Sequence, residues 1–283
     1  NHLILMSKVV IIGGGHAGAN VAFSLRKDGF DGEIDLLSNE EFLPYHRPPL
    51  SKDFLKKNIE TEKLFFKSES FYQEQNISFH PNALISSIDT NLKAITTDAS
   101  TFSFDYLVFA TGASPRLLSM QNADAKNLFY LRKISDVLEI HYQLESAKDI
   151  VLIGGGYIGL EVAASLRKKG MAVTVIEAAN RILARVASEP LADSLTKLHE
   201  DNGVQVLTGV GVDSINAEDG IFDSVTLTSG QKIVGDMLIT GIGVFPDSKL
   251  AAEAGIETQR KDGGAILVDE TMKTSEKDVY AVG

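Results

Sequence analysis

Two stretches of the chain carry the same pattern of hydrophobic and polar positions. Residues 9–29 read VVIIGGGHAGANVAFSLRKDG and residues 150–170 read IVLIGGGYIGLEVAASLRKKG, and 13 of these 21 positions are identical. A short, wholly apolar run predicts a buried strand of a parallel sheet, and apolar residues at helical spacing predict an amphipathic helix. Each stretch therefore predicts a strand, a tight glycine turn and a helix, and together they form an internal repeat.

The runs that follow extend the repeat to both halves of the chain. A second apolar run after each helix, at 34–37 and 173–176, completes a β-α-β unit with parallel strands. Each half then ends on a strand that runs into glycine, in DYLVFATG (105–112) and DMLITGIG (236–243). We interpret the short alternating runs in between as a strand meander in each half, at 77–80, 93–97, 101–104, 204–207 and 224–228. The pattern predicts an α/β fold with two Rossmann-like dinucleotide-binding domains, each containing a parallel sheet and a strand meander.

The length and composition are those of a globular protein with two domains. Its 283 residues exceed the usual size of one domain, and apolar and charged contents of 44% and 23% are ordinary. No apolar run approaches the roughly 20 residues of a membrane span, and a net charge of −11 disfavours nucleic acid as a partner. The opening NHLILMSK has no basic segment before its apolar residues, so we expect a cytoplasmic protein with neither a membrane nor a nucleic-acid partner.

Cysteine is absent from the chain. This absence excludes disulfides and thiolate metal sites within these residues, and no metal site is predicted. It also excludes a redox-active cysteine pair, which argues against dithiol and coenzyme A disulfide reductases.

The glycines of the repeat fit the G-x-G-x-x-G pattern of dinucleotide-binding turns. The first glycine permits the tight turn, the second lets a pyrophosphate approach the backbone, and the third lets the helix pack closely on the strand. The phosphates then lie at the helix N-terminus, where free N–H groups and the helix dipole favour anions. The two triplets are Gly13, Gly15 and Gly18 in the first copy and Gly154, Gly156 and Gly159 in the second.

The ends of the second strands differ between the two copies. VTVIE places Glu177 18 residues after Gly159, where a carboxylate accepts hydrogen bonds from an adenosine ribose and repels a 2′-phosphate. We therefore expect NADH rather than NADPH in the second unit. In the first copy, LLSNEE places Ser38 at the matching position, and Asn39 or Glu40 either bonds a ribose or belongs to an ordinary polar turn.

Residues 44–52 read PYHRPPLSK and place two cations in a stiff segment. Three prolines fix much of the backbone, so Arg47 and Lys52 are held toward whatever they address.

Seven motifs occur in a characteristic order: GGGHAG, PYHRPPLSK, FATGASPR, GGGYIGLE, VTVIE, GIGVFPD and TSEKDVYAVG. With them the chain resembles, over nearly its whole length, the FAD-dependent ferredoxin-NAD reductases, which include the putidaredoxin, rhodocoxin and rubredoxin reductases. The resemblance implies a glutathione-reductase-like fold in which an FAD domain (1–114 and 241–283) is interrupted by an NAD domain (115–240). A C-terminal interface domain usually follows in this family, so we expect further chain beyond residue 283.

The resemblance also implies which residues contact the two cofactors, FAD and NADH. Arg47 and Arg116 are either phosphate neighbours or surface cations. Tyr157 either covers the flavin until nicotinamide displaces it or is a packed aromatic residue. The family usually has an acid where this chain has Asn39. The implied FAD contacts are Gly13, Gly15, Ala17, Gly18, Asn39, Glu40, Arg47, Lys52, Ile85, Thr111, Gly112, Arg116 and Arg132, and the implied NAD contacts are Gly154, Gly156, Tyr157, Ile158, Gly159, Glu161, Glu177, Gly241 and Gly243.

Two of these residues are implied to act in catalysis. The resemblance pairs Lys52 with Glu161 of GGGYIGLE and places both beside the flavin. A lysine in a partly apolar site needs a nearby carboxylate to keep its proton. A fixed cation there favours hydride acceptance, because it stabilises the negative charge of the reduced flavin. The alternative roles are those of a surface lysine and a helix-face glutamate.

The implied function is hydride transfer from NADH to FAD, followed by electron transfer to a small iron-sulfur protein of an oxygenase or P450 chain. A [2Fe-2S] ferredoxin is the first choice of acceptor, rubredoxin the second, and the ascorbate radical a more distant one. An NADH-responsive signalling protein like apoptosis-inducing factor is an alternative, as is a dinucleotide-binding scaffold without flavin. The sequence leaves open whether the protein is a monomer or a dimer.

Overall fold

The computed structural model describes residues 7–260 and 263–283, so the apolar residues 3–6 of the opening NHLILMSK lie outside the described residues. Contacts within the chain define two compact units. The first contains the described residues of Asn1–His46, Leu64–Ser114 and Phe245–Gly283, and the second contains Arg47–Lys63 and Pro115–Val244. Residues 47–63 thus group with the second unit, whereas the domain ranges given above include them in the first. The assignment of FAD to one domain and NADH to the other stays a prediction.

The first unit is built on a five-stranded parallel sheet with the strand order β20-β7-β1-β2-β3. These strands are β1 (Lys8–Ile12), β2 (Glu33–Leu37), β3 (Ile77–His80), β7 (Tyr106–Phe109) and β20 (Val279–Ala281). The run VVII is apolar throughout because both faces of β1 are covered. Val9 and Ile11 pack into one hydrophobic cluster, and Val10 and Ile12 pack into another.

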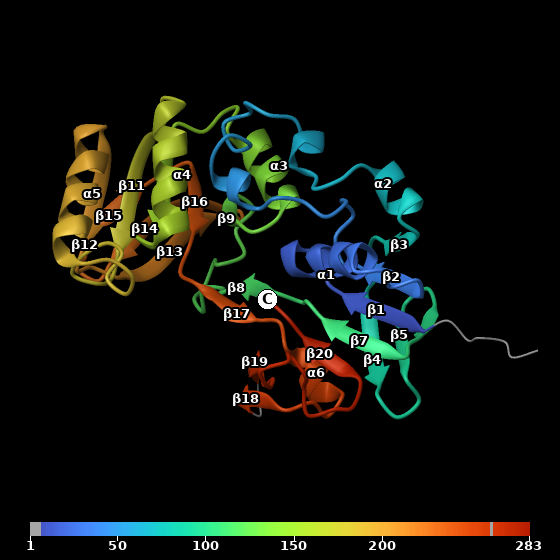
Figure 1. The fold of residues 1–283 in the computed structure, drawn as a ribbon. Helices are drawn as coiled ribbons and strands as arrows, with labels where there is room; N and C mark the ends of the chain where they lie inside the picture. Colours follow the sequence, from blue (N-terminus) through green and yellow to red (C-terminus); the bar gives the residue numbers. More distant parts are fainter. Residues whose placement is uncertain (1–6, 261–262) are drawn as a thin grey trace, which may run out of the picture. The chain divides into compact units, whose positions relative to one another are not determined.

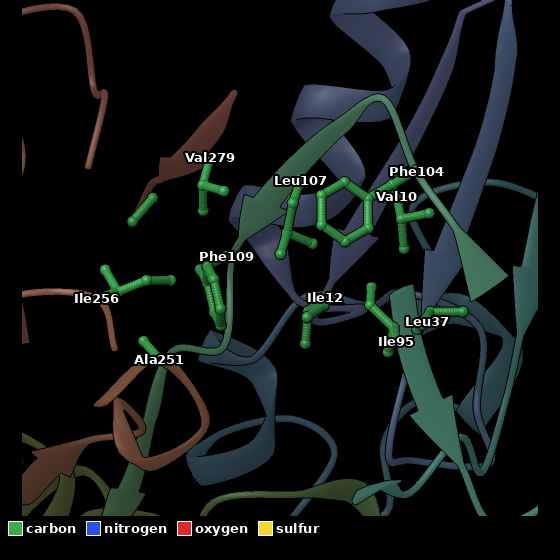
Figure 2. Close-up of a cluster of buried hydrophobic side chains, with 11 residues drawn as sticks. Val10, Ile12, Leu37, Ile95, Phe104, Leu107, Phe109, Ala251, Ile256 and Val279 are labelled. Carbon is green, nitrogen blue, oxygen red and sulfur yellow. The ribbon is translucent and has the colours of Figure 1, made fainter. Parts of the chain in front are cut away.

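Helices and an antiparallel meander form the other layers of this unit. They are α1 (His16–Lys27), α2 (Glu69–Glu74), β4 (Ile85–Asp89), β5 (Ala94–Thr97), β6 (Thr101–Ser103), α6 (Lys249–Glu253), β18 (Thr258–Arg260) and β19 (Gly263–Ile266). Ala22 of α1 and Tyr72 of α2 belong to the cluster of Val9 and Ile11. Ile95 of the meander and Ala251 of α6 belong to the other cluster, which Figure 2 shows around β7. The sheet is therefore covered on both faces.

The second unit repeats this plan (Figure 1) with the parallel strand order β12-β11-β10-β16-β9. Its elements are β9 (Leu128–Tyr130), α3 (Ile134–Gln143), β10 (Asp149–Ile153), α4 (Tyr157–Lys168), β11 (Ala172–Glu177), α5 (Glu189–Asp201), β12 (Val204–Thr208), β13 (Val212–Glu218), β14 (Ile221–Leu227), β15 (Lys232–Val234) and β16 (Met237–Thr240). Leu160 of α4 and Ala192 of α5 share one cluster. Phe222 and Val225 of the β13-β14-β15 meander pack with Val151 in another.

The chain changes unit four times, after residues 46, 63, 114 and 244. The last two changes lie in a short ribbon of two strands, β8 (Ala113–Pro115) and β17 (Val244–Pro246). Within the described residues, no helix combines the length and the apolar character needed to cross a bilayer.

The prediction of the meanders was wrong at one strand in each half. Residues 77–80 and 204–208 do not join the antiparallel meanders but pair in parallel with β2 and β11, as outer strands of the two sheets. Their alternating pattern is the cause of the error. An outer strand is partly exposed on one face, so it shows the same alternation as a meander strand. The sequence patterns used above also missed α2, α3, α5 and α6, whose apolar positions lie outside the repeated motifs.

Segment 47–63 is held to the second unit by side chains of α3 and α4. It begins with the 3₁₀ turn η1 (Pro48–Ser51) and ends at η2 (Thr61–Leu64), and it buries Leu50, Phe54 and Leu55. Its backbone carbonyls accept hydrogen bonds from the partner side chains. Ser165 Oγ donates to Ser51 O at 2.7 Å, and Lys169 Nζ donates to Lys56 O at 3.1 Å.

His141 of α3 completes this attachment. Its Nε2 lies 2.9 Å from Phe54 O and 3.2 Å from Leu55 O, so the neutral ring donates its N–H to these carbonyls. Burial lowers the pKa of His141, and the positive charges of Lys57 and Lys169 lower it further. The hydrogen bonds to the two carbonyls oppose this shift without cancelling it. The folded protein therefore binds a proton at His141 less readily than the unfolded chain does.

We expect His141 to make the protein less stable in mild acid. As pH falls below about 6.5 the unfolded chain takes up the proton first, so stability is lost until the pH reaches the lower folded-state pKa. The urea-unfolding free energy of the wild type should therefore fall more between pH 7.5 and pH 5 than that of His141→Gln. At pH 7.5 the variant should be less stable by about 1–2 kcal/mol. Equal falls for the two proteins would contradict the buried neutral histidine.

Candidate functional site

The first glycine loop connects β1 to α1 and leaves no room for side chains behind it. Gly13 has φ +117°, and a Cβ on it would lie 2.1 Å from Ala110 O at the end of β7. A Cβ on Gly18 would lie 1.9 Å from Gly13 O. The first and third glycines are therefore required by close packing of strand, turn and helix, as the motif predicts.

The N-terminus of α1 is left open for a ligand. Gly15 is its N-cap and offers no side-chain cap, and the first turn of the helix contains no acidic residue. The free N–H groups and the positive end of the helix dipole then favour an anion. These features fit the pyrophosphate of a dinucleotide.

The second loop has the same construction. Gly154 has φ +111°, and a Cβ on it would lie 2.4 Å from Gly241 O, at the residue that follows β16. A Cβ on Gly159 would lie 2.1 Å from Gly154 O. Gly156 is the N-cap of α4, and a Cβ there would meet no atom within 4 Å. This open space is what the approach of a pyrophosphate to the backbone requires.

The exposed residues Tyr157 and Ile158 begin α4, directly after this loop. Tyr157 is 58% exposed and is therefore not a packed aromatic of the second unit. Its proposed function as a cover for the flavin stays a prediction.

Glu177 ends β11, where the sequence predicts a contact to ribose. Its carboxylate accepts one hydrogen bond from the N–H of Gly155 at 2.7 Å and another from the N–H of Ala179 at 2.8 Å. The carboxylate is thus fixed against the glycine loop, and its remaining lone pairs are directed by these two bonds. The sequence analysis did not anticipate the contact between Glu177 and the loop.

The matching position of the first unit is chemically different. Ser38 is buried beside the glycine loop and accepts a hydrogen bond from the N–H of Glu40 at 3.1 Å. The Glu40 carboxylate accepts a hydrogen bond from the Tyr45 hydroxyl at 2.5 Å, whereas Asn39 is exposed. Of the two candidates for a ribose contact, Asn39 is thus the more accessible.

The remaining predicted FAD contacts of the first unit fall close to this loop or to the end of β7. Ala17 lies in the first turn of α1, with its Cβ 3.6 Å from the position of a Cβ on Gly283. Ile85 opens β4, shortly after Ala83, whose N–H donates to Ser38 O. Thr111 donates its hydroxyl hydrogen to Asp247 O at 2.6 Å, and Gly112 O accepts the N–H of Asp247.

In the second unit, four predicted cofactor contacts are joined in two pairs by hydrogen bonds to backbone carbonyls. Arg47 Nη1 donates to Arg132 O at 2.9 Å, so these two predicted FAD contacts touch each other. The N–H of Arg116 donates to Gly243 O at 2.9 Å. Gly243 has φ +105°, which favours glycine at that position.

Lys52 and Glu161 form the ion pair that the resemblance implies. Lys52 follows η1 and Glu161 lies in the second turn of α4, and Lys52 Nζ is 2.7 Å from Glu161 Oε2. The partly apolar site expected for Lys52 stays a prediction; its side chain is 46% exposed. The carboxylate therefore serves to fix the position of the ammonium group rather than to compensate for burial.

Sequence reasoning missed Ser51. Its hydroxyl donates to Glu161 Oε2 at 2.6 Å, and Ser51 is almost completely buried. Ser165, which holds the Ser51 carbonyl, was missed as well, although it lies four residues after Glu161 on α4 and therefore on the same helix face. That spacing is a signal that the sequence contains. For Ser51 the only signal is its place beside Lys52 in RPPLSK.

Comparisons with known proteins agree with this geometry. The family model described as pyridine nucleotide-disulphide oxidoreductase matches residues 7–283. The chain is 40% identical to the rubredoxin-NAD(+) reductase of Pseudomonas putida over 97% of this chain and 71% of that protein. It is 38% identical to the rhodocoxin reductase of Rhodococcus erythropolis over 97% of this chain and 64% of that protein.

Solved structures give the same result. The putidaredoxin reductase in a covalent complex with putidaredoxin matches with a TM-score of 0.93 and 35% identity, over 98% of this chain and 67% of that one. The ferredoxin reductase of the CYP199A2 system from Rhodopseudomonas palustris also gives 0.93, with 36% identity, over 98% and 68% of the two chains. These matches confirm the predicted fold class, the oxidoreductase activity and the cofactors FAD and NADH. The chain belongs to the pyridine nucleotide-disulphide oxidoreductase family, in the group that contains the rubredoxin-NAD(+) reductases.

Proposed function

We propose that the protein is an NADH-dependent reductase that passes electrons through FAD to a small iron-sulfur protein, with a [2Fe-2S] ferredoxin as first choice and rubredoxin as second. The observation that carries this proposal is the pair of glycine loops, each ending in a helix whose N-cap is a glycine and whose first turn has no acid. Two such sites in one chain suit two dinucleotides. The proposal includes a cytoplasmic location, where NADH is available.

The residues of the two units have separate tasks. The loop of Gly13, Gly15 and Gly18 holds the FAD pyrophosphate at α1, and the loop of Gly154 and Gly156 holds the NADH pyrophosphate at α4. When bound, the flavin supplies the redox chemistry, since it accepts a hydride and releases electrons singly. Lys52 provides a fixed positive charge that stabilises negative charge developing on the acceptor of the hydride, and Glu161 holds Lys52 in place.

The choice of acceptor rests on the relatives and on the chemistry of the chain. The relatives are reductases of rubredoxin, rhodocoxin and putidaredoxin. Because this chain contains no cysteine, it has no thiol pair that would relay electrons to a disulfide. A one-electron carrier protein is therefore the acceptor that suits these residues best.

The function is tested by stopped-flow mixing of the purified protein, in the longest form encoded, with NADH under anaerobic conditions. We expect the flavin absorbance to bleach, and then to recover when a [2Fe-2S] ferredoxin or rubredoxin is added. Recovery with a small iron-sulfur protein that outpaces recovery with oxygen supports the reductase. A colourless protein that ignores added FAD overturns the proposal. Slow turnover together with an NADH-driven change in oligomeric state favours a signalling role instead.

Gly156→Ala should weaken NADH binding without unfolding the protein. The new methyl group meets no protein atom within 4 Å and Gly156 has φ −83°, so the free energy of unfolding should change by less than about 1 kcal/mol. The methyl group occupies the space of the pyrophosphate, and the NADH dissociation constant should rise by about tenfold or more. Titration calorimetry measures the change in NADH binding, and urea unfolding measures the change in stability.

Gly154→Ala is the contrasting variant, since its methyl group would lie 2.4 Å from Gly241 O and should destabilise the fold. Unchanged NADH binding by Gly156→Ala would contradict the assignment.

Glu177→Ala should move the coenzyme preference toward NADPH. The variant removes a carboxylate that repels a 2′-phosphate, and it frees the N–H groups of Gly155 and Ala179. The ratio of the dissociation constants of NADPH and NADH, measured by calorimetry, should fall by about tenfold, which corresponds to about 1.4 kcal/mol. Asp201→Ala, which makes the same change in net charge at an exposed position on α5, should leave the ratio unchanged. Equal effects of both substitutions would show that only net charge matters.

A further inference from the structure

Glu161 receives two donors on a single carboxylate oxygen. Lys52 Nζ lies 2.7 Å from Oε2, and Ser51 Oγ donates to the same Oε2 at 2.6 Å. The two donors differ in how firmly they are held. The Lys52 side chain is 46% exposed on a flexible stem, whereas Ser51 is only 4% exposed. By itself, an exposed ion pair fixes geometry only loosely, because solvent competes for both charges and the long side chain keeps some mobility.

Ser51 itself is fixed from three directions. It ends the 3₁₀ turn that Pro48 and Pro49 begin, so its backbone has little freedom. Its carbonyl accepts the hydroxyl hydrogen of Ser165, which is also buried, at 2.7 Å. Phe54, three residues after Ser51, is buried, and its carbonyl is hydrogen-bonded to His141. The hydroxyl of Ser51 is therefore a donor in a set position, and its bond to a carboxylate is charge-assisted and strong.

We propose that Ser51 is a positioning residue that selects the orientation of the Glu161 carboxylate and, through it, the place of the Lys52 ammonium group. Without the hydroxyl, Glu161 keeps its charge but samples other rotamers, and Lys52 follows it or separates from it. The consequence for hydride transfer rests on the proposed function, in which Lys52 supplies a fixed positive charge. The positioning itself does not depend on that function.

The test is the rate at which an acylating reagent modifies Lys52, followed by peptide mass spectrometry in the purified full-length protein. A lysine that a carboxylate holds in place reacts slowly, because the reagent must displace the carboxylate to reach Nζ. Ser51→Ala should raise the rate at Lys52 by about fivefold relative to Lys197, an exposed lysine of α5 in the same unit. Glu161→Gln sets the upper limit of the effect.

Two further variants separate positioning from packing. Ser165→Ala deletes an equally buried hydroxyl that holds the backbone of Ser51 but does not touch Glu161. The other two constraints on Ser51 remain in this variant, so the rate at Lys52 should rise by less than in Ser51→Ala. Ser51→Thr keeps the hydroxyl and should restore slow acylation. If Ser51→Ala fails to fold, Ser51→Cys, whose thiol is a weak donor, should give an intermediate rate.

A rate at Lys52 that is the same in Ser51→Ala and the wild type would overturn the proposal, as would an equal rise in Ser165→Ala. Stopped-flow reduction by NADH adds the link to function. Ser51→Ala should slow bleaching of the flavin by about fivefold with the NADH dissociation constant unchanged. Faster acylation with unchanged bleaching would leave the positioning in place and overturn the proposed role of Lys52 in hydride transfer, so the two failures are distinguishable.

Discussion

The structure depends on a close approach between each glycine loop and the end of a neighbouring strand. Gly13 lies so near Ala110 O, and Gly154 so near Gly241 O, that a single added carbon would overlap the carbonyl oxygen at 2.1 or 2.4 Å. Van der Waals contact requires more than 3 Å, so only glycine permits the approach. The approach places the first turn of α1 and of α4 at the carboxyl edge of its own sheet, with free N–H groups at the helix end. The free N–H groups at these two places, which favour an anion, thus result from packing and need no charged side chain.

The same scaffold carries different chemistry at its two strand ends. In the second unit the Glu177 carboxylate accepts hydrogen bonds from the N–H groups of Gly155 and Ala179, so a negative charge is held against the glycine loop. In the first unit the smaller Ser38 occupies the corresponding place, where its Cβ lies 2.7 Å from the position of a Cβ on Gly14. A fixed negative charge in one proposed cradle and a neutral, buried hydroxyl in the other give the two sites different chemistry. The repeat thus gives both units the same loop geometry, and the residue at the end of the second strand, Ser38 or Glu177, distinguishes the two sites.

The sequence predicted what depends on backbone and spacing, and missed what depends on packing between distant segments. The runs VVII and IVLI, the glycines after them and the helices all lie where the pattern placed them, because local sterics and two-sided burial dictate each of these features. The sequence could not predict that β3 and β12 join the parallel sheets. A partly exposed outer strand alternates apolar and polar residues just as a strand of an antiparallel meander does. His141 and Ser51 were also missed. Their partners, Phe54 O and Glu161, lie 87 and 110 residues away in the sequence, and no local pattern reports such a contact.

The attachment of segment 47–63 explains why a lysine distant from the second glycine loop in sequence has a fixed relation to it in space. Every anchor described for this segment belongs to the second unit: the hydroxyl of Ser165, the ring of His141 and the carboxylate of Glu161. Ser165 and Glu161 lie on α4, the helix that begins at Gly156. A helix is stiff over three turns, so the distance from the open N-terminus of α4 to the segment that carries Lys52 is set within one rigid element and its bound segment. The positive charge of Lys52 and the proposed cradle for a dinucleotide therefore belong to the same structural unit.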